Sequence, residues 1–63
     1  MERIEKNKLL LKMAQLRVQL PSYAMSLFFE KYPEHIDIKG KVTDVFNGRQ
    51  VDRLIIEKFE SLI

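Results

Sequence analysis

The stretch of residues 39–49 reads KGKVTDVFNGR and carries the most informative pattern in the sequence. Its apolar residues Val42, Val45 and Phe46 are separated by three positions and by one, which places them on one face of a helix but on both faces of a strand. The Asn47-Gly48 pair that follows is typical of a left-handed cap at the carboxyl end of a helix. The spacing therefore predicts a helix from about Lys39 to Phe46 that ends at this pair.

The same region leaves a β-hairpin open as an alternative. Ile36, Ile38, Gly40 and Val42 alternate with a period of two, and an Asn-Gly pair is the strongest short signal for a hairpin turn. We favour the helix because only a helix gathers the later apolar residues on one face. On that interpretation Asp37 caps or directly precedes the helix.

Upstream of this stretch, the sequence predicts a long first helix. Leu9, Met13, Leu16 and Leu20 recur at spacings of four, three and four, which form one stripe of a helix from about Glu2 to Gln19. Leu20-Pro21 ends it, because proline lacks a backbone donor and biases the preceding residue away from the helical region.

A short second helix follows. Its apolar residues lie at intervals typical of a helix and are Ala24, Leu27, Phe28 and Tyr32. Pro33 closes the segment. Either Pro21 in the first turn or Ser22 as the N-cap residue would open it.

The last predicted helix runs from about Val51 to the C-terminus. The residues expected on its apolar face are Val51, Leu54, Ile55, Phe59, Leu62 and Ile63. Asp52 suits the first turn, where a carboxylate meets the positive end of the helix dipole. Ile56 is expected at the flank of the core or against a partner.

Together these segments predict an all-α fold, a compact four-helix domain formed by residues 1–63 as a single unit. The chain has 63 residues and no cysteine, so its stability depends on packing or on association, and a reducing, cytoplasmic location is expected. The longest uninterrupted apolar run has three residues, far short of the ~20 that span a bilayer. We therefore expect no membrane partner.

The sequence lacks the groups that catalysis requires. It offers no nucleophile with a base, no metal-ligand spacing and no glycine-rich phosphate loop. The one histidine, His35, is expected to be a solvated loop residue. We expect no enzyme activity, no metal and no cofactor, so binding is the remaining class of function.

The middle of the chain resembles the helix-turn-helix of phage-repressor-like (lambda-repressor-like) DNA-binding proteins. In that family the second helix is similar to Val-x-x-Val-Leu-Asn-Gly, and here Val42, Val45, Phe46 and Asn47-Gly48 match in order, with phenylalanine in place of leucine. The resemblance covers about residues 20–60, and its helix-turn-helix-like part spans about residues 20–50. The segment between the two helices, Tyr32 to Ile38, is longer than the family's turn. The resemblance implies a small transcriptional regulator that binds double-stranded DNA as a dimer.

The resemblance also implies roles for individual residues. The base-reading candidates on the second helix of the motif are Lys39, Lys41, Thr43 and Asp44. The phosphate-binding candidates at the helix ends and in the following loop are Ser22, Tyr23, Asn47, Arg49 and Gln50. Asp44 is expected to accept from a cytosine or to pair with a cation such as Lys41.

Partner surfaces are suggested by apolar residues and by charge. The candidate dimer contacts are Leu11, Val18, Ile56, Phe59, Leu62 and Ile63. Residues 1–19 carry five basic side chains against two acidic ones, which is compatible with a polyanion nearby. The alternative is a helical protein-interaction module that does not bind DNA, such as a phage or mobile-element accessory protein, and that docks through exposed aromatics at Phe28, Phe29 and Tyr32.

Overall fold

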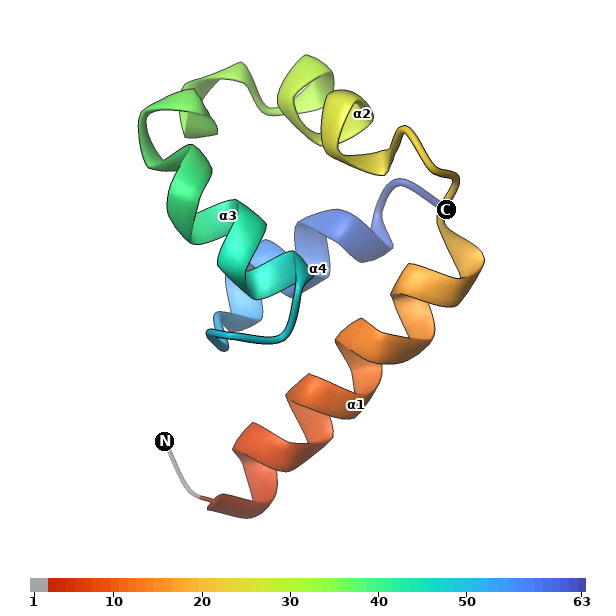
Figure 1. The fold of residues 1–63 in the computed structure, drawn as a ribbon, viewed down its shortest axis with the longest axis vertical. Helices are drawn as coiled ribbons and strands as arrows, with labels where there is room; N and C mark the ends of the chain where they lie inside the picture. The colour runs from red at the N-terminus through yellow and green to blue at the C-terminus, as the bar shows by residue number, and fades with distance from the viewer. Residues whose placement is uncertain (1–2) are drawn as a thin grey trace.

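The computed structural model describes residues 3–63 and shows an all-α domain (Figure 1). Its elements are α1 (Arg3–Gln19), α2 (Ala24–Lys31), the 3₁₀ helix η1 (Pro33–Ile38), α3 (Lys39–Phe46) and α4 (Arg53–Glu60). Residues 3–63 contain no β-strand, so the β-hairpin alternative is wrong. The prediction of a small four-helix domain is confirmed.

Helix α1 follows the predicted apolar stripe. Leu9, Met13, Leu16 and, just after the helix, Leu20 are all buried, because their spacing brings them to one side of the helix. The helix ends before Pro21 as expected, while its predicted start at Glu2 lies outside the described residues.

Helix α2 begins without a side-chain cap. Its N-cap residue is Tyr23, and no side chain accepts from the first turn, so the predicted N-cap role of Ser22 is wrong. The amide of Ala24 instead donates to the carbonyl of Pro21 at 3.0 Å. This local turn replaces the side-chain cap.

The segment between α2 and α3 is a 3₁₀ helix rather than an open loop. Pro33 occupies its first turn, where a missing amide hydrogen costs nothing. The amide of Tyr32 donates to the carbonyl of Phe28 at 2.8 Å and closes α2 before η1 begins. Asp37 lies inside η1, and Ile38 is the N-cap residue of α3, so Asp37 precedes α3 but does not cap it.

Helix α3 has the predicted limits and the predicted cap. Val42 and Val45 are fully buried, and Phe46 is partly buried against the core. Gly48 has φ +82°, its amide donates to Val45, and the amide of Arg49 donates to Asp44 at 2.8 Å. These two bonds form a Schellman motif, which requires a residue that tolerates positive φ.

Helix α4 is shorter than predicted and exposes a different face. Asp52 is its N-cap residue, whose carboxylate accepts from the amide of Ile55 at 3.1 Å. Leu54 is 66% exposed and Ile56 only 1%, so both predictions for these two residues are wrong. At about 100° per residue, Ile56 lies about 60° from the buried Phe59, whereas Leu54 lies about 140° away.

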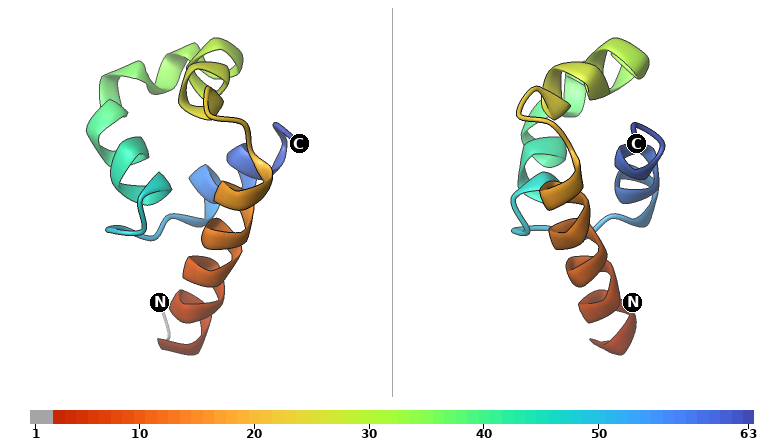
Figure 2. Two further views of the ribbon diagram at one scale, coloured as in Figure 1. Left: turned by 45° about the vertical axis from the view of Figure 1, so that its right-hand side comes forward. Right: turned by 90° about the vertical axis from the view of Figure 1, so that its right-hand side faces the viewer.

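The core forms where α4 meets the other three helices. Helix α4 contacts α1, α2 and α3, and it stands to one side of them in the right-hand view of Figure 2. Phe59 of α4 packs against α2 and α3. Its ring centroid lies 4.5 Å from that of Phe28 and 5.2 Å from that of Phe46. The N-terminal end of α1 extends beyond the other helices in each view (Figure 2).

Within residues 3–63, no helix has both the length and the apolar character that a membrane span requires.

Candidate nucleic-acid interface

The candidate interface is the solvent-facing side of α3 together with the loop that follows it. Lys39 and Lys41 are exposed, while Thr43 and Asp44 are half-buried. The hydroxyl of Thr43 donates back to the carbonyl of Lys39 at 2.9 Å, so it is satisfied within the helix. Asn47 is exposed at the end of the same face.

Gly40 leaves the first turn of this face open. A Cβ atom built at Gly40 would meet no atom within 4 Å. The α3 surface therefore has a short profile at Gly40, Thr43 and Asn47, which permits a flat or grooved partner to approach the helix closely.

Asp44 organises the loop after α3 rather than pairing with Lys41. Its carboxylate accepts from Nη1 of Arg49 at 3.3 Å and from Nε2 of Gln50 at 3.2 Å. The predicted Asp44–Lys41 pair is wrong, because Lys41 lies on the flank of α3 that faces α4. Three of the predicted residues, Asp44, Arg49 and Gln50, are thus brought together by the turn at Gly48.

Lys41 pairs with the N-cap residue of α4. Its Nζ atom lies 3.1 Å from the Asp52 carboxylate, whose side chain is 25% exposed. Burial alone would raise the pKa of Asp52, but the Ile55 amide, the Lys41 hydrogen bond and charge, and the Leu54 amide together lower this pKa from its usual 3.8. Asp52 therefore remains ionised and fixes the start of α4 to α3.

Arg17 is a residue that the sequence reasoning missed at this site. Its guanidinium donates to the carbonyl of Phe46 at the end of α3, where a cation complements the negative end of the helix dipole. Its Nη1 atom would lie 3.6 Å from a Cβ at Gly48. The contact joins residues 29 positions apart, so no local pattern in the sequence could have revealed it.

Ser22 and Tyr23 lie apart from the α3 candidates. Both are exposed before the start of α2. The segment between α1 and α2 that contains them lies across the molecule from α3 (Figure 1). The solvent-facing side of α3 and its following loop thus hold Lys39, Thr43, Asp44, Asn47, Arg49 and Gln50. Lys41 lies on the flank that faces α4, where it pairs with Asp52, and Ser22 and Tyr23 lie elsewhere.

The predicted dimer residues divide into two groups. Leu11, Val18 and Ile63 are exposed, whereas Ile56 and Phe59 are fully buried in the core of this chain. Leu62 is partly buried against that core. Ile56 and Phe59 are therefore wrong as partner contacts, because α4 turns both inward against the other helices.

His35 is not the solvated loop residue that was expected. Its side chain is 15% exposed, its ring packs edge-on against Phe28 with centroids 5.6 Å apart, and its Nε2 atom lies 2.9 Å from Nζ of Lys58. This burial follows from η1, which folds the segment onto α2 and α4. Residues 3–63 contain no cluster of three side chains suited to a metal ion.

The aromatic side chains on α2 do not form an exposed patch. Phe28 is fully buried, and Phe29 and Tyr32 pack against the core. The hydroxyl of Tyr32 also lies 2.8 Å from Oγ of Ser61. The predicted exposure of these aromatics is wrong, because the rings of α2 and α4 pack against one another.

Comparisons with family models, curated proteins and solved structures found no match for this chain.

Proposed function

We propose that this protein is a small helix-turn-helix-like DNA-binding protein, in which the exposed side of α3 and its following loop contact double-stranded DNA. The observation that carries the proposal is the short, polar surface of α3 with cations at its two ends. Lys39 lies at its start and Arg49 follows its end. A transcriptional role, as in repressor-like regulators, is part of this proposal.

The shape of α3 supports the proposal. A helix with its side chains is about 10–12 Å across, close to the ~12 Å width of the major groove. Gly40 is open, and Thr43 and Asn47 have short side chains. Such a face brings the helix backbone near base edges, which longer side chains would prevent.

The charge around α3 also supports it. The region around α3 has an excess of two positive charges. Its four cations are Arg17, Lys39, Lys41 and Arg49, and its two anions are Asp44 and Asp52. The two ion pairs, Lys41–Asp52 and Arg49–Asp44, hold two of these cations in place. Phosphate contacts by such side chains position a protein on DNA, while contacts to base edges give sequence preference.

The experiment is a fluorescence-anisotropy titration of labelled random duplex DNA across a salt series. We expect binding at low salt that weakens as salt rises, because bound cations displace counterions from the phosphates. Arg49→Ala should lower the slope of log K against log salt by about one. Lys39→Ala should weaken binding to all sequences or relax preference at one base.

A matched control is Lys6→Ala, which removes an exposed lysine from α1 and should leave the salt slope nearly unchanged. Absence of binding at low salt, with protein at about 100 µM, would reject the proposal, because non-specific Kd values are usually tighter than this. If Lys6→Ala and Arg49→Ala weakened DNA binding equally, the assignment of the DNA-binding surface to α3 would be rejected.

A further inference from the structure

The outward side of α1 carries an apolar ridge that no other part of residues 3–63 covers. Ile4, Leu11 and Val18 are 69%, 60% and 86% exposed. They are seven residues apart, so they form one line along the helix, opposite the stripe that enters the core. Single exposed aliphatic residues are ordinary, but three of them aligned on one side of a helix form a candidate interaction surface.

The residues that flank this ridge are almost free of charge. Within about 60° of the ridge, the other side chains of α1 are Asn7, Lys8, Ala14 and Gln15. Lys8 is the only charged one, although α1 as a whole is basic. Small and uncharged neighbours allow another helix to pack along the ridge.

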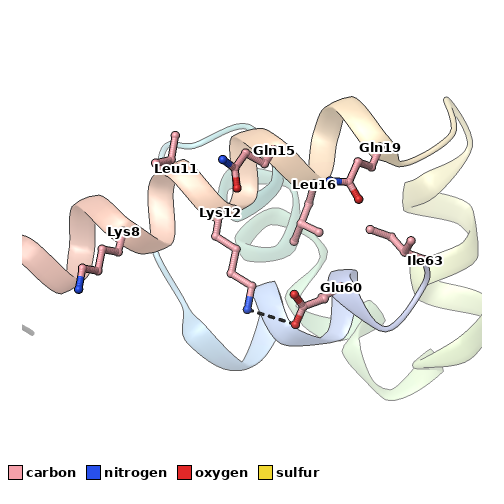
Figure 3. Close-up of a pocket in the computed structure, with 8 residues that line it drawn as sticks. All are labelled: Lys8, Leu11, Lys12, Gln15, Leu16, Gln19, Glu60 and Ile63. Atoms are coloured by element: carbon pink, nitrogen blue, oxygen red, sulfur yellow. Dashed lines mark ion pairs between the residues drawn. The ribbon is translucent and has the colours of Figure 1, made fainter.

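A groove runs beside the ridge, between α1 and the end of α4 (Figure 3). It has a volume of about 650 Å³. Lys8 lines one end, and Gln19 and Ile63 line the other (Figure 3). Its one carboxylate belongs to Glu60, which pairs with Lys12 at 3.1 Å, and Ile63 is itself 64% exposed.

We propose that the occupant of this surface is a second copy of the chain, with the two α1 helices antiparallel and the twofold axis at Leu11. The spacing 4, 11 and 18 is symmetric about residue 11. In this register Leu11 faces the partner's Leu11, and Ile4 faces the partner's Val18. The same contact is therefore made twice, as a closed dimer requires.

One pair of opposite charges favours this register. Lys8 lies level with residue 14 of the partner, on the side where the groove holds Glu60. Each Lys8 thus lies near the partner's Glu60, which also pairs with its own Lys12 at 3.1 Å. A parallel pair would instead place Arg3 beside the partner's Lys8, in the g and e positions that repel when both are cationic.

This register also covers the apolar side chains of the ridge and of the adjoining end of the groove. Ile4 lies level with residues 18 and 19 of the partner, next to the end of the groove formed by Gln19 and Ile63. One contact then covers Ile4, Leu11, Val18 and Ile63 together. A contact made chiefly by one helix from each chain is small for a specific interface, so we expect a dimer that dissociates on dilution.

The first test is sedimentation equilibrium of the full chain from about 10 µM to about 1 mM. Leu11→Glu places two carboxylates against each other on the axis and should raise the dimer Kd at least about tenfold. Leu54→Glu is the matched control, since Leu54 is equally exposed but lies on α4, and it should leave Kd unchanged. Circular dichroism verifies that both variants fold.

Cysteine cross-linking tests the direction of the helices, because the native chain has no cysteine. Under mild oxidation Leu11→Cys should form a covalent dimer. Ile4→Cys alone should not, because its two copies would lie about 21 Å apart along the helix axis, beyond the reach of a disulfide. A mixture of Ile4→Cys and Val18→Cys chains should give the mixed dimer.

Two results would overturn this proposal. The first is a wild-type protein that stays monomeric throughout the concentration range. The second is Ile4→Cys cross-linking to itself as readily as Leu11→Cys, which indicates parallel helices. Neither result bears on DNA binding by α3, which is measured on different residues, so the two proposals fail separately.

Discussion

The Nζ atom of Lys41 in α3 lies 3.1 Å from the carboxylate of Asp52, the N-cap residue of α4. The same carboxylate accepts from the amide of Ile55 at 3.1 Å. The Asp52 side chain therefore caps the N-terminus of α4 and also links α4 to the flank of α3. The contact leaves the opposite side of α3 as the surface available to a partner.

Replacing Asp52 tests this link. Asp52→Ala should lower the free energy of unfolding at pH 7 by about 1 kcal/mol, which is typical for loss of an N-cap side chain. Urea denaturation followed by circular dichroism measures the change. Asp52→Asn is the matched control, because asparagine keeps the cap but not the charge opposite Lys41, so it should cost less than alanine.

The pH dependence of stability has a defined direction at this site. The pKa of Asp52 is lower in the folded chain than its usual 3.8, so its stabilising effect is complete above that value and is lost as pH falls through the folded pKa. The stability difference between wild type and Asp52→Asn should therefore shrink as the pH is lowered below about 4. If this stability difference instead grew as the pH fell, the lowered pKa of Asp52 would be contradicted.

The two glycines should respond to alanine in opposite directions. Gly48→Ala should destabilise the protein by about 1–2 kcal/mol, because φ +82° is strained for any residue with a Cβ. Gly40→Ala should stabilise it by about 0.5–1 kcal/mol, since the site is helical and has open space. Thermal or urea unfolding of both variants measures this contrast. Equal effects would mean that the cap is not formed.

Helix α4 provides a second contrast. Ile56→Val removes one methylene from the core and should cost about 0.5–1.5 kcal/mol. Leu54→Ala removes more carbon, but from an exposed side chain, and should change stability by less than about 0.5 kcal/mol. The reverse order in urea unfolding would place Leu54 rather than Ile56 in the core.

Asp44→Asn tests the surface of α3 directly. If this surface faces DNA, the variant should bind random duplex more tightly at low salt than wild type, because it removes a carboxylate near the phosphates and releases Arg49. The anisotropy assay measures this change. Glu57→Gln is the matched control, since it neutralises an exposed carboxylate on α4. A similar gain from both variants would indicate a general effect of net charge.

Much of the fold could be predicted from local patterns. The spacing of Val42, Val45 and Phe46 predicted α3 with its observed limits, and Asn47-Gly48 predicted its cap. The stripe from Leu9 to Leu20 predicted the buried side of α1. These predictions succeed because helical periodicity and a positive-φ glycine act within a few residues of chain.

The candidate site was less predictable, because its contacts join distant parts of the chain. Lys41 reaches Asp52, Arg17 reaches the end of α3, and Lys58 reaches His35. Among the predicted site residues, Asp44 meets Arg49 and Gln50, and Thr43 meets Lys39, because each set lies within one turn of the chain. A sequence pattern identifies residue types but not which distant charge each will meet.

Local sequence patterns were sufficient to predict the four helices and their main breaks at Pro21 and Gly48. The lack of cysteine likewise means that the chain relies on packing. The packing of the helices determines that Ile56 is buried and Leu54 exposed, and that His35 enters an aromatic cluster. It also leaves Ile4, Leu11 and Val18 exposed along one side of α1. The reason is physical. Helix formation depends on neighbours in the chain, whereas the side that each helix buries depends on the helices packed against it.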